Sequence, residues 1–400
     1  MPMKRLACVA LALMMGALLP AGAAAGLPPV ESRPANTTYQ PAFSGQTRAP
    51  GIQTQTPYSV EVLTDRLERP WAVAALPDGR LIITQKAGGL RVYSREGGLS
   101  EPIHGIPDVA DSGQGGLLDV AVAPDFDSSR LLYFTLAERL SGGAVTALAR
   151  GRLAEDARGV TDYQVLWRAL PAHPSQGHFG SRVVVDGEGH LFVSTGDRQG
   201  DDTRPLAQEL GSGYGKIVRL TADGQPAPGN PFTGQAGALP EVFSLGHRNV
   251  QGLAIHPQTG QLWASEMGPR GGDELNLILA GHNHGWPLIS YGIEYSGLPV
   301  GRGLTQMAGM AQPAYYWDPV LAPSGMAFHD GAGFPEWAGN LFIGGLAGSH
   351  ISRLVLQEDR VVGEERLLEH EGQRFRDIAQ GADGALYAVT DQGRLYRIGP

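Results

Sequence analysis

The sequence is poor in cysteine, in lysine and in long apolar runs, and each shortage excludes a class of protein. Cys8 is the single cysteine among 400 residues, so no disulfide framework can hold the fold together. Runs of acids and of bases are both absent and the formal net charge is −9. A basic face for phosphate backbones is therefore missing, and we expect no nucleic-acid partner. A polytopic membrane protein would need repeated apolar spans of roughly 20 residues, which the sequence lacks.

Several catalytic motifs are missing as well. No Gly-x-Ser-x-Gly surrounds Ser181, and the chain has no His-Glu-x-x-His, no Walker loop and no Gly-x-Gly-x-x-Gly. A serine hydrolase, a zinc peptidase and an ATP- or nicotinamide-dependent enzyme are therefore unsupported. What remains is a globular chain, 42% hydrophobic and 18% charged, that can bury a core.

The N-terminus has the pattern of a secretory signal peptide. Lys4 and Arg5 precede an apolar run of about 14 residues, and a stretch of small residues ends at Ala25. We therefore predict a signal peptide over residues 1–25 and a periplasmic or secreted protein without a membrane span; a retained signal anchor is the alternative. Cleavage would remove Cys8 and two bases, which takes the net charge from −9 to −11. Residues 26–58, rich in Pro, Thr, Gln and Ala, are predicted to form a flexible leader.

Glycine and proline are abundant, at 57 and 29 residues without a Gly-X-Y period, which indicates many tight turns and short strands. A turn with Asp or Gly followed by Leu and a short apolar strand recurs along the chain. The leucines of these repeats are Leu81, Leu132, Leu191, Leu262, Leu341 and Leu386. Their irregular spacing favours separate sheets with variable loops. We therefore predict an all-β domain over residues 59–400, a six-bladed β-propeller, with a two-domain β-sandwich as the alternative.

Polar residues stand in glycine-rich loops between the expected strands, where the backbone can approach a ligand closely. These residues are Gln114, His178, Arg248, Asn249, Asp273, Glu274, Arg374 and Arg376. Each alone has an ordinary explanation, since a lone His in such a loop is more often a turn or packing residue. Their comparable positions in successive blades favour one shared site. Carbonyls of Gly268 and Pro269 near two carboxylates are oxygen ligands that suit Ca²⁺, with an ordinary acidic turn as the alternative.

Together these motifs resemble the soluble, pyrroloquinoline quinone (PQQ)-dependent aldose sugar and glucose dehydrogenases. The resemblance runs from Leu67 to Tyr396 and rests on the segments 113–118, 178–180, 246–249, 268–274 and 374–376. It is nearer to the aldose sugar dehydrogenases than to the glucose dehydrogenases proper. The resemblance implies an exported six-bladed propeller that binds PQQ and Ca²⁺.

The resemblance also assigns roles to particular residues. His178 matches the general base that takes the proton of the anomeric hydroxyl while hydride passes to the quinone, and Asp197 matches the carboxylate that orients this imidazole. The implied cofactor-binding residues are Gln114, Arg248, Asn249, Tyr295, Ala347, Arg374 and Arg376. The implied calcium ligands are the carbonyls of Gly268 and Pro269, with Glu274 and the backbone near His284 for a second site.

The chain departs from the family at three positions. Ala347 stands where a lysine is frequent, which leaves Lys86 and Lys216 as the lysines of the chain after signal cleavage. Met267 replaces a glutamine of the glucose dehydrogenases, and His284 replaces a tyrosine of the aldose branch.

The function implied by the resemblance is oxidation of the anomeric carbon of aldoses to lactones, with electrons passed to an external acceptor. Two other classes stay open. A calcium-dependent lactonase-type hydrolase would leave Arg374 and Arg376 without a role, and a non-catalytic sugar-binding propeller is permitted by the fold alone. A monomer and a homodimer are both compatible with the sequence.

Overall fold

The computed structural model describes residues 27–400 of the chain. The signal peptide predicted over residues 1–25, and Cys8 with it, lies outside the described residues. Within residues 27–400 no helix combines the length and the apolar character that crossing a membrane would require.

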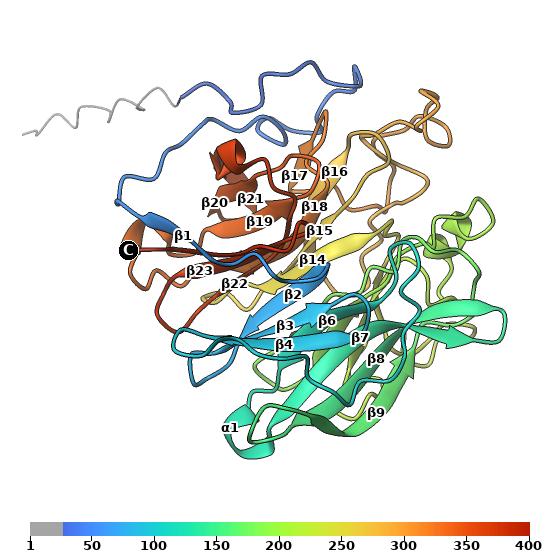
Figure 1. Ribbon diagram of the computed structural model, residues 1–400. Coiled ribbons are helices and arrows are strands. Elements are labelled where there is room, and N and C mark those ends of the chain that lie inside the picture. Colours follow the sequence, from blue (N-terminus) through green and yellow to red (C-terminus); the bar gives the residue numbers. More distant parts are fainter. Residues whose placement is uncertain (1–26) are drawn as a thin grey trace, which may run out of the picture.

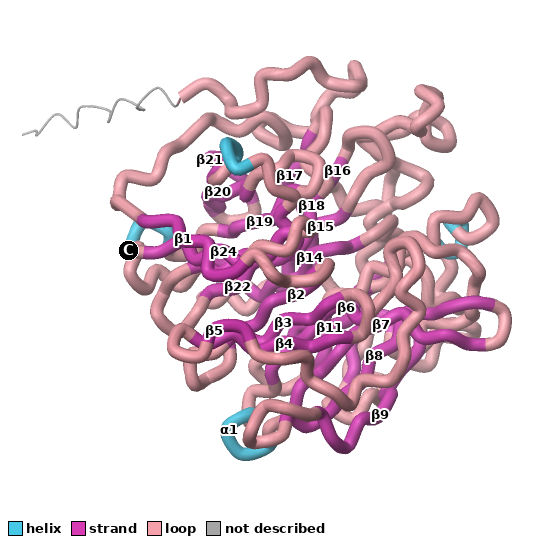
Figure 2. Tube along the Cα trace, viewed as in Figure 1, coloured by secondary structure: helices cyan, strands magenta, loops and turns pink. Residues whose placement is uncertain are grey.

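The described residues form six four-stranded antiparallel sheets, arranged as the blades of a propeller (Figure 1). In spatial order, the first sheet contains β2 (Pro70–Ala75), β3 (Leu81–Gln85), β4 (Gly89–Ser94) and β5 (Gly98–Leu99), and the second contains β6 (Leu117–Val122), β7 (Leu131–Leu140), β8 (Gly143–Leu153) and β9 (Val160–Arg168). The third contains β10 (Val183–Val185), β11 (Leu191–Ser194), β12 (Lys216–Leu220) and β13 (Val242–Leu245), and the fourth contains β14 (Val250–Ile255), β15 (Leu262–Glu266), β16 (Asp273–Ile278) and β17 (Tyr315–Trp317). The fifth contains β18 (Pro323–Phe328), β19 (Leu341–Gly345), β20 (Ile351–Gln357) and β21 (Arg360–Leu367), and the sixth contains β22 (Phe375–Gln380), β23 (Leu386–Thr390), β24 (Leu395–Gly399) and β1 (Ser59–Thr64). The helical segments of this part of the chain are short and lie in loops (Figure 2): α1 (Phe126–Ser129) and the 3-10 turns η1 (Arg204–Gln208), η2 (Pro335–Trp337) and η3 (Glu369–Glu371).

The sheets close into a ring. Their first strands, β2, β6, β10, β14, β18 and β22, contact one another in cyclic order. Strand β1 completes the sixth sheet by pairing with β24, where Glu61 lies opposite Arg397. Strands from both ends of the domain therefore hold the last blade together, and the predicted six-bladed β-propeller is confirmed.

The repeat leucines mark the second strand of every blade. They begin β3, β11, β15, β19 and β23 or stand second in β7, and each is at most 5% exposed. The residue two positions before each leucine has a left-handed backbone, with φ between 58° and 83°. In five blades this residue is glycine, which adopts the left-handed conformation without steric cost. In the second blade Arg130 takes its place. The recurring phrase of the sequence is thus the hairpin between the first two strands of a blade.

The hydrophobic core lies between neighbouring sheets. Alternate residues of a strand face opposite sides of its sheet, so each sheet contributes to two apolar layers. Ile82 packs in the layer shared with the β6–β9 sheet, whereas Leu81 and Ile83 pack in the layer shared with the sixth sheet. Stability therefore comes from blade-to-blade packing, and the loops at the strand ends are left to build a site.

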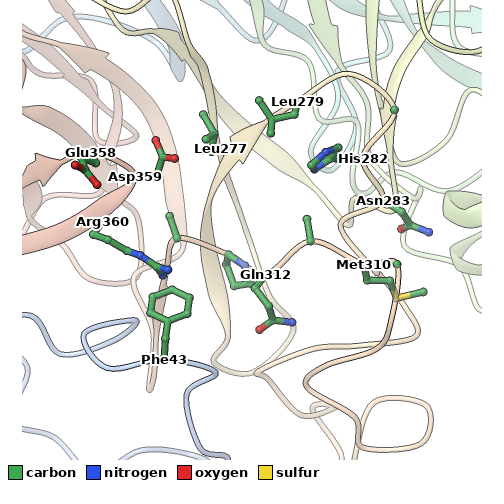
Figure 3. A pocket seen from close by; sticks show the side chains of 15 residues that line it. Phe43, Leu277, Leu279, His282, Asn283, Met310, Gln312, Glu358, Asp359 and Arg360 are labelled. Atoms are coloured by element: carbon green, nitrogen blue, oxygen red, sulfur yellow. The ribbon is translucent and has the colours of Figure 1, made fainter.

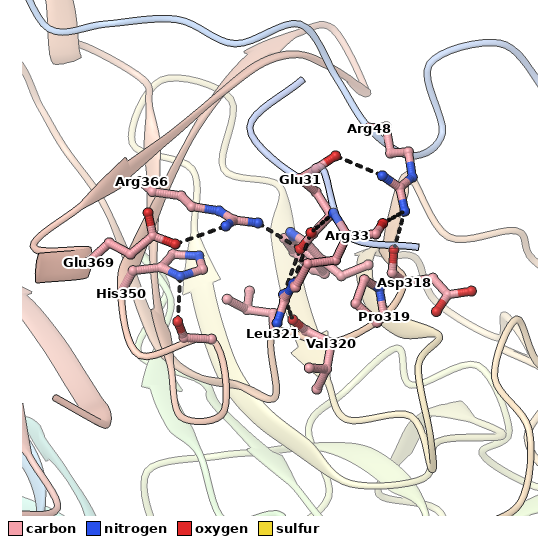
Figure 4. A network of polar contacts seen from close by, with 12 residues as sticks. Glu31, Arg33, Arg48, Asp318, Pro319, Val320, Leu321, His350, Arg366 and Glu369 are labelled. Atoms are coloured by element: carbon pink, nitrogen blue, oxygen red, sulfur yellow. Dashed lines mark hydrogen bonds and ion pairs between the residues drawn. The ribbon is translucent and has the colours of Figure 1, made fainter. Parts of the chain in front are cut away.

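Residues 27–58 form no strand and run along the outside of the later blades (Figure 1). Glu31 pairs with Arg33 at 2.6 Å and with Arg366 of β21 at 2.7 Å. Arg48 donates to the carbonyl oxygen of Asp318 at 3.0 Å (Figure 4). The irregular backbone agrees with the composition of the expected leader, while these contacts anchor the leader to the blades. The domain limits at residues 26, 58 and 400 stay predictions.

Candidate active site

Residues from five blades, most of them in loops next to the strands, line a cavity of about 250 Å³. The lining residues are Trp71, Lys86, Gly113, Gln114, Gln251, Met267, Ala322, Leu346, Arg374 and Arg376. Its volume is near the lower end of ordinary small-molecule pockets, which hold about 300–1,000 Å³. Gln114, Arg374 and Arg376, predicted from distant segments to bind one cofactor, are thereby brought together.

The arginine pair is aligned by a carboxylate that the sequence analysis missed. Arg374 Nε donates to Asp391 Oδ2 at 2.9 Å, and Arg376 Nε donates to Asp391 Oδ1 at 2.8 Å. Burial would raise the pKa of Asp391, but the charges and hydrogen bonds of the two arginines outweigh burial and lower this pKa. The ionised carboxylate therefore fixes the directions of both guanidinium groups.

Gln114 connects this cavity to the loop that carries His178. The side-chain Oε1 of Gln114 accepts the main-chain N–H of His178 at 2.9 Å, and the main-chain N–H of Gln114 donates to the carbonyl of Gln176 at 2.8 Å. His178 has a φ of 45°, a left-handed conformation that costs energy in any residue with a side chain. On the other side of the same loop, Asn249 Oδ1 accepts the N–H of Gly180 at 3.1 Å. Gln114 and Asn249 thus hold the loop in its strained shape.

His178 and Asp197 form a buried pair. His178 Nδ1 lies 2.6 Å from Asp197 Oδ1, and both side chains are at most 5% exposed. The carboxylate also accepts the N–H of Gln199 at 2.8 Å and the indole N–H of Trp286 at 2.7 Å. Because the carboxylate only accepts, these partners assign the proton of the neutral ring to Nδ1. Among residues 27–400 no group is hydrogen-bonded to Nε2, so this nitrogen can accept a proton.

Electrostatics keep this pair in the state that a base requires. Burial and the charge of Arg248 lower the pKa of His178, although Asp197 acts in the opposite direction. Burial would raise the pKa of Asp197, but His178 and Arg248 bring it below its ordinary value. At neutral pH the imidazole is therefore neutral and the carboxylate charged.

Arg248 joins the pair to the predicted calcium loop. Its main-chain carbonyl accepts the N–H of Asp197 at 2.8 Å, and its guanidinium lies 5.2 Å from the ring centre of Trp286. Its Nη1 donates to the carbonyls of Met267 at 3.0 Å and Gly268 at 2.8 Å. One arginine therefore contacts both the residues around the base and a predicted metal-binding carbonyl.

A second, small cavity of about 10 Å³ lies beside Gly268 and is large enough for a single water or ion. Glu266, Glu274 and His284 line this cavity. Burial, and then the charge of Glu266, raises the pKa of Glu274 to about 8. Asn276 Nδ2 donates to both carboxylates at 3.1 Å. Burial and mutual repulsion thus oppose charging both carboxylates at once, and a hard divalent cation such as Ca²⁺ between them would stabilise both charges.

The remaining predicted residues lie beside the two cavities or away from them. Pro269 is buried next to Gly268, and Ala347 is exposed next to Leu346 of the larger cavity. Tyr295 is 69% exposed and lines neither cavity. The cofactor-binding role of Tyr295 stays a prediction.

A more voluminous cavity, of about 790 Å³, lies between β16 and the leader (Figure 3). His282, Gln312 and Arg360 are among its lining residues, and Arg360 lies 3.4 Å from the ring centre of Phe43. None of the residues predicted for catalysis, cofactor or metal lines this cavity. We therefore place the candidate active site at the cavity of about 250 Å³ that Arg374 and Arg376 line, because this cavity has the cationic groups and the adjacent base.

Known proteins are similar to this chain over most of its length. The family described as Glucose / Sorbosone dehydrogenase matches residues 67–397. The aldose sugar dehydrogenase of Escherichia coli is 44% identical over 347 residues, which cover 86% of this chain and 93% of that protein. The crystal structure of the soluble Escherichia coli aldose sugar dehydrogenase in its apo-form has a TM-score of 0.82 at 43% identity, covering 86% of this chain and 100% of that chain. The PQQ-bound form of an aldose sugar dehydrogenase from Streptomyces coelicolor has a TM-score of 0.72 at 29% identity, covering 87% and 99%.

Proposed function

Because the chain belongs to the glucose/sorbosone dehydrogenase family, a family of oxidoreductases, we propose that it oxidises the anomeric carbon of aldose sugars to lactones with PQQ and Ca²⁺. In this reaction the carbon loses a hydride and its hydroxyl group loses a proton. The two electrons then leave for an external acceptor. The N-terminal pattern supports a periplasmic or secreted site of action.

The observation that carries this proposal is the His178–Asp197 pair next to a cationic cavity. His178 Nε2 takes the proton of the anomeric hydroxyl, since Nδ1 is already committed to Asp197 at 2.6 Å. Asp197 stays ionised and stabilises the imidazolium that forms. Trp286 keeps the carboxylate in position by its 2.7 Å hydrogen bond, so the base meets the substrate in one orientation.

The cavity lined by Arg374 and Arg376 suits a flat molecule with several carboxylates. Arg374 and Arg376 present guanidinium groups that match carboxylates in shape and charge, and Gln114 and Gln251 add amide groups. PQQ, when bound, supplies the two-electron acceptor for the hydride. Arg248, next to the base, places a further positive charge near the reacting atoms.

Calcium has two candidate positions in the same region. The carbonyls of Gly268 and Pro269 would hold the ion that accompanies the cofactor. Glu274 and the backbone near His284 would hold a second ion, which would neutralise the buried carboxylate pair of the small cavity.

The test is dye reduction by the purified protein with glucose or another aldose, with and without added PQQ and Ca²⁺. We expect activity only when both are present, and a loss of about 10²–10⁴-fold in kcat in His178→Ala, the usual contribution of a positioned base. His173→Ala is the matched control, because His173 lies in the same loop and pairs at 3.3 Å with the exposed Asp202. This control should retain its activity.

The other function classes correspond to distinct results. Lactone hydrolysis that needs calcium but not PQQ would replace the proposal by a lactonase-type hydrolase. Sugar binding without turnover of any aldose would replace it by a sugar-binding propeller.

A further inference from the structure

Around the cavity lined by Arg374 and Arg376, part of the positive charge is compensated by a carboxylate of the protein itself. Arg374 and Arg376 share the carboxylate of Asp391, so most of the positive charge of one arginine is already compensated. A tricarboxylate such as PQQ brings more negative charge than this group alone can match. Ala347 offers no further cation, since its side chain is a methyl group.

Lys86 brings a cation to the same cavity from the first blade. It follows β3 and lines the cavity beside Trp71. Its main-chain N–H donates to the carbonyl of Arg69 at 3.1 Å, and its carbonyl accepts the N–H of Leu117 at 3.0 Å. Its Nζ donates to the carbonyl of Gly113 at 2.7 Å. An ammonium group has three N–H donors, so two remain for a ligand.

From this geometry we propose that Lys86 binds a carboxylate of PQQ and is the third cation of the clamp formed with Arg374 and Arg376. The inference rests on the proposed function and adds a residue to its cofactor site. Because the backbone of Lys86 is tied to two blades and Nζ to a carbonyl, little side-chain freedom is lost when the ligand binds.

The surrounding charges support this role. Burial lowers the pKa of Lys86, and repulsion from Arg376 and Arg69 lowers it further, while Asp391 and Asp111 act in the opposite direction. In the free protein, burial and the nearby arginines therefore make the charged form of Lys86 unfavourable. An anion between Lys86 and Arg376 would remove this cost, which makes binding of a carboxylate favourable.

The other lysine of the described chain is not available for such a role. Lys216 is fully buried and uses its three donors on the carbonyls of Leu206 at 3.0 Å, Ala207 at 3.0 Å and Tyr214 at 2.6 Å. It lines neither the cavity of Arg374 and Arg376 nor the small cavity beside Gly268. The two lysines therefore have separable functions, one in ligand binding and one in stability.

The experiment titrates PQQ into the full apo-protein in the presence of Ca²⁺ and follows the quenching of tryptophan fluorescence. We expect Lys86→Gln to weaken PQQ binding about tenfold, equivalent to about 1.4 kcal/mol. Lys86→Arg keeps the charge and should stay within about threefold of the wild type. Arg80→Gln is the matched control, since Arg80 carries the same charge at the opposite end of β3, paired with Asp78, and it should bind PQQ like the wild type.

Salt dependence separates a charge contact from a structural effect. Raising the ionic strength should weaken PQQ binding more in the wild type than in Lys86→Gln, because the variant has lost one screened attraction. Unchanged affinity in Lys86→Gln, or equal losses in Lys86→Gln and Lys86→Arg with the same salt dependence, would overturn the assignment. Failure of the wild type itself to bind PQQ would instead overturn the proposed function.

Discussion

Replacing Asp197 by asparagine probes the base without changing the shape of the site. The wild-type carboxylate accepts three hydrogen bonds, from His178 Nδ1 at 2.6 Å, from the N–H of Gln199 at 2.8 Å and from Trp286 Nε1 at 2.7 Å. An asparagine amide has one acceptor and one donor end, so it cannot serve all three donors.

Both orientations of the amide are unfavourable. If its oxygen faces His178, its NH₂ group meets the indole N–H of Trp286, and two buried donors oppose each other at a cost of about 1–3 kcal/mol. If its NH₂ group faces His178, Nδ1 must become the acceptor and the ring proton moves to Nε2, which then cannot take the substrate proton. We therefore expect kcat to fall by about 10²–10⁴-fold, or about 2.7–5.4 kcal/mol of barrier.

The assay is dye-coupled oxidation of an aldose by the reconstituted enzyme as a function of pH. Asp197 raises the pKa of His178 against the effects of burial and Arg248. Removing this negative charge should therefore move the acid limb of the kcat/KM profile to lower pH, while the plateau falls. Asp202→Asn serves as the control, since Asp202 pairs with His173 at the surface. A plateau within about threefold of the wild type and an unmoved acid limb would refute the reasoning.

Two further predictions concern stability and are measured by chemical denaturation. Lys216→Met should lower the free energy of unfolding by about 2–3 kcal/mol, because three carbonyls in the interior lose the donor group to which they are bonded. Lys86→Gln is its control and should change this free energy by less than about 1 kcal/mol. Equal losses of stability in the two variants would contradict the conclusion that Lys216 stabilises the fold and Lys86 binds the ligand. Gly79→Ala should cost about 1–2 kcal/mol from its left-handed φ of 83° alone, with no atom within 4 Å of the added Cβ. Gly384→Ala should cost more, because its Cβ would collide with the carbonyl oxygen of Ala332. A loss no larger than that of Gly79→Ala would contradict this steric argument.

Part of the candidate site could have been found from strand pairing. Phe375 lies opposite Thr390 in the β22–β23 hairpin, so Asp391 stands opposite Arg374. A hairpin is local in sequence, and its register therefore predicts this ion pair once the turn has been identified. The roles assigned by resemblance to His178, Asp197 and the calcium ligands stay predictions, although the structure brings His178 and Asp197 into contact.

Other members of the site could not have been found in this way. Trp286 reaches Asp197 across 89 positions of sequence, and Lys86 shares a cavity with Arg376 across almost the whole domain. No local pattern marks either residue, because their roles depend on which loops meet when the ring of blades closes. Tyr295 differs from both, since its predicted role comes from a motif match, its side chain is 69% exposed, and the role stays a prediction.

The sequence by itself determined the architecture, because a left-handed residue two positions before a buried leucine recurs in every blade and each hairpin forms from neighbouring residues. Hairpins of this kind depend on short-range sterics and on burial of alternate side chains, and residues close together in the sequence determine both. Only the tertiary structure decided which polar groups became neighbours. Closure of the ring through β1 and β24 places loops from distant segments around one cavity, and the partners, the burial and the pKa of His178 follow from that closure.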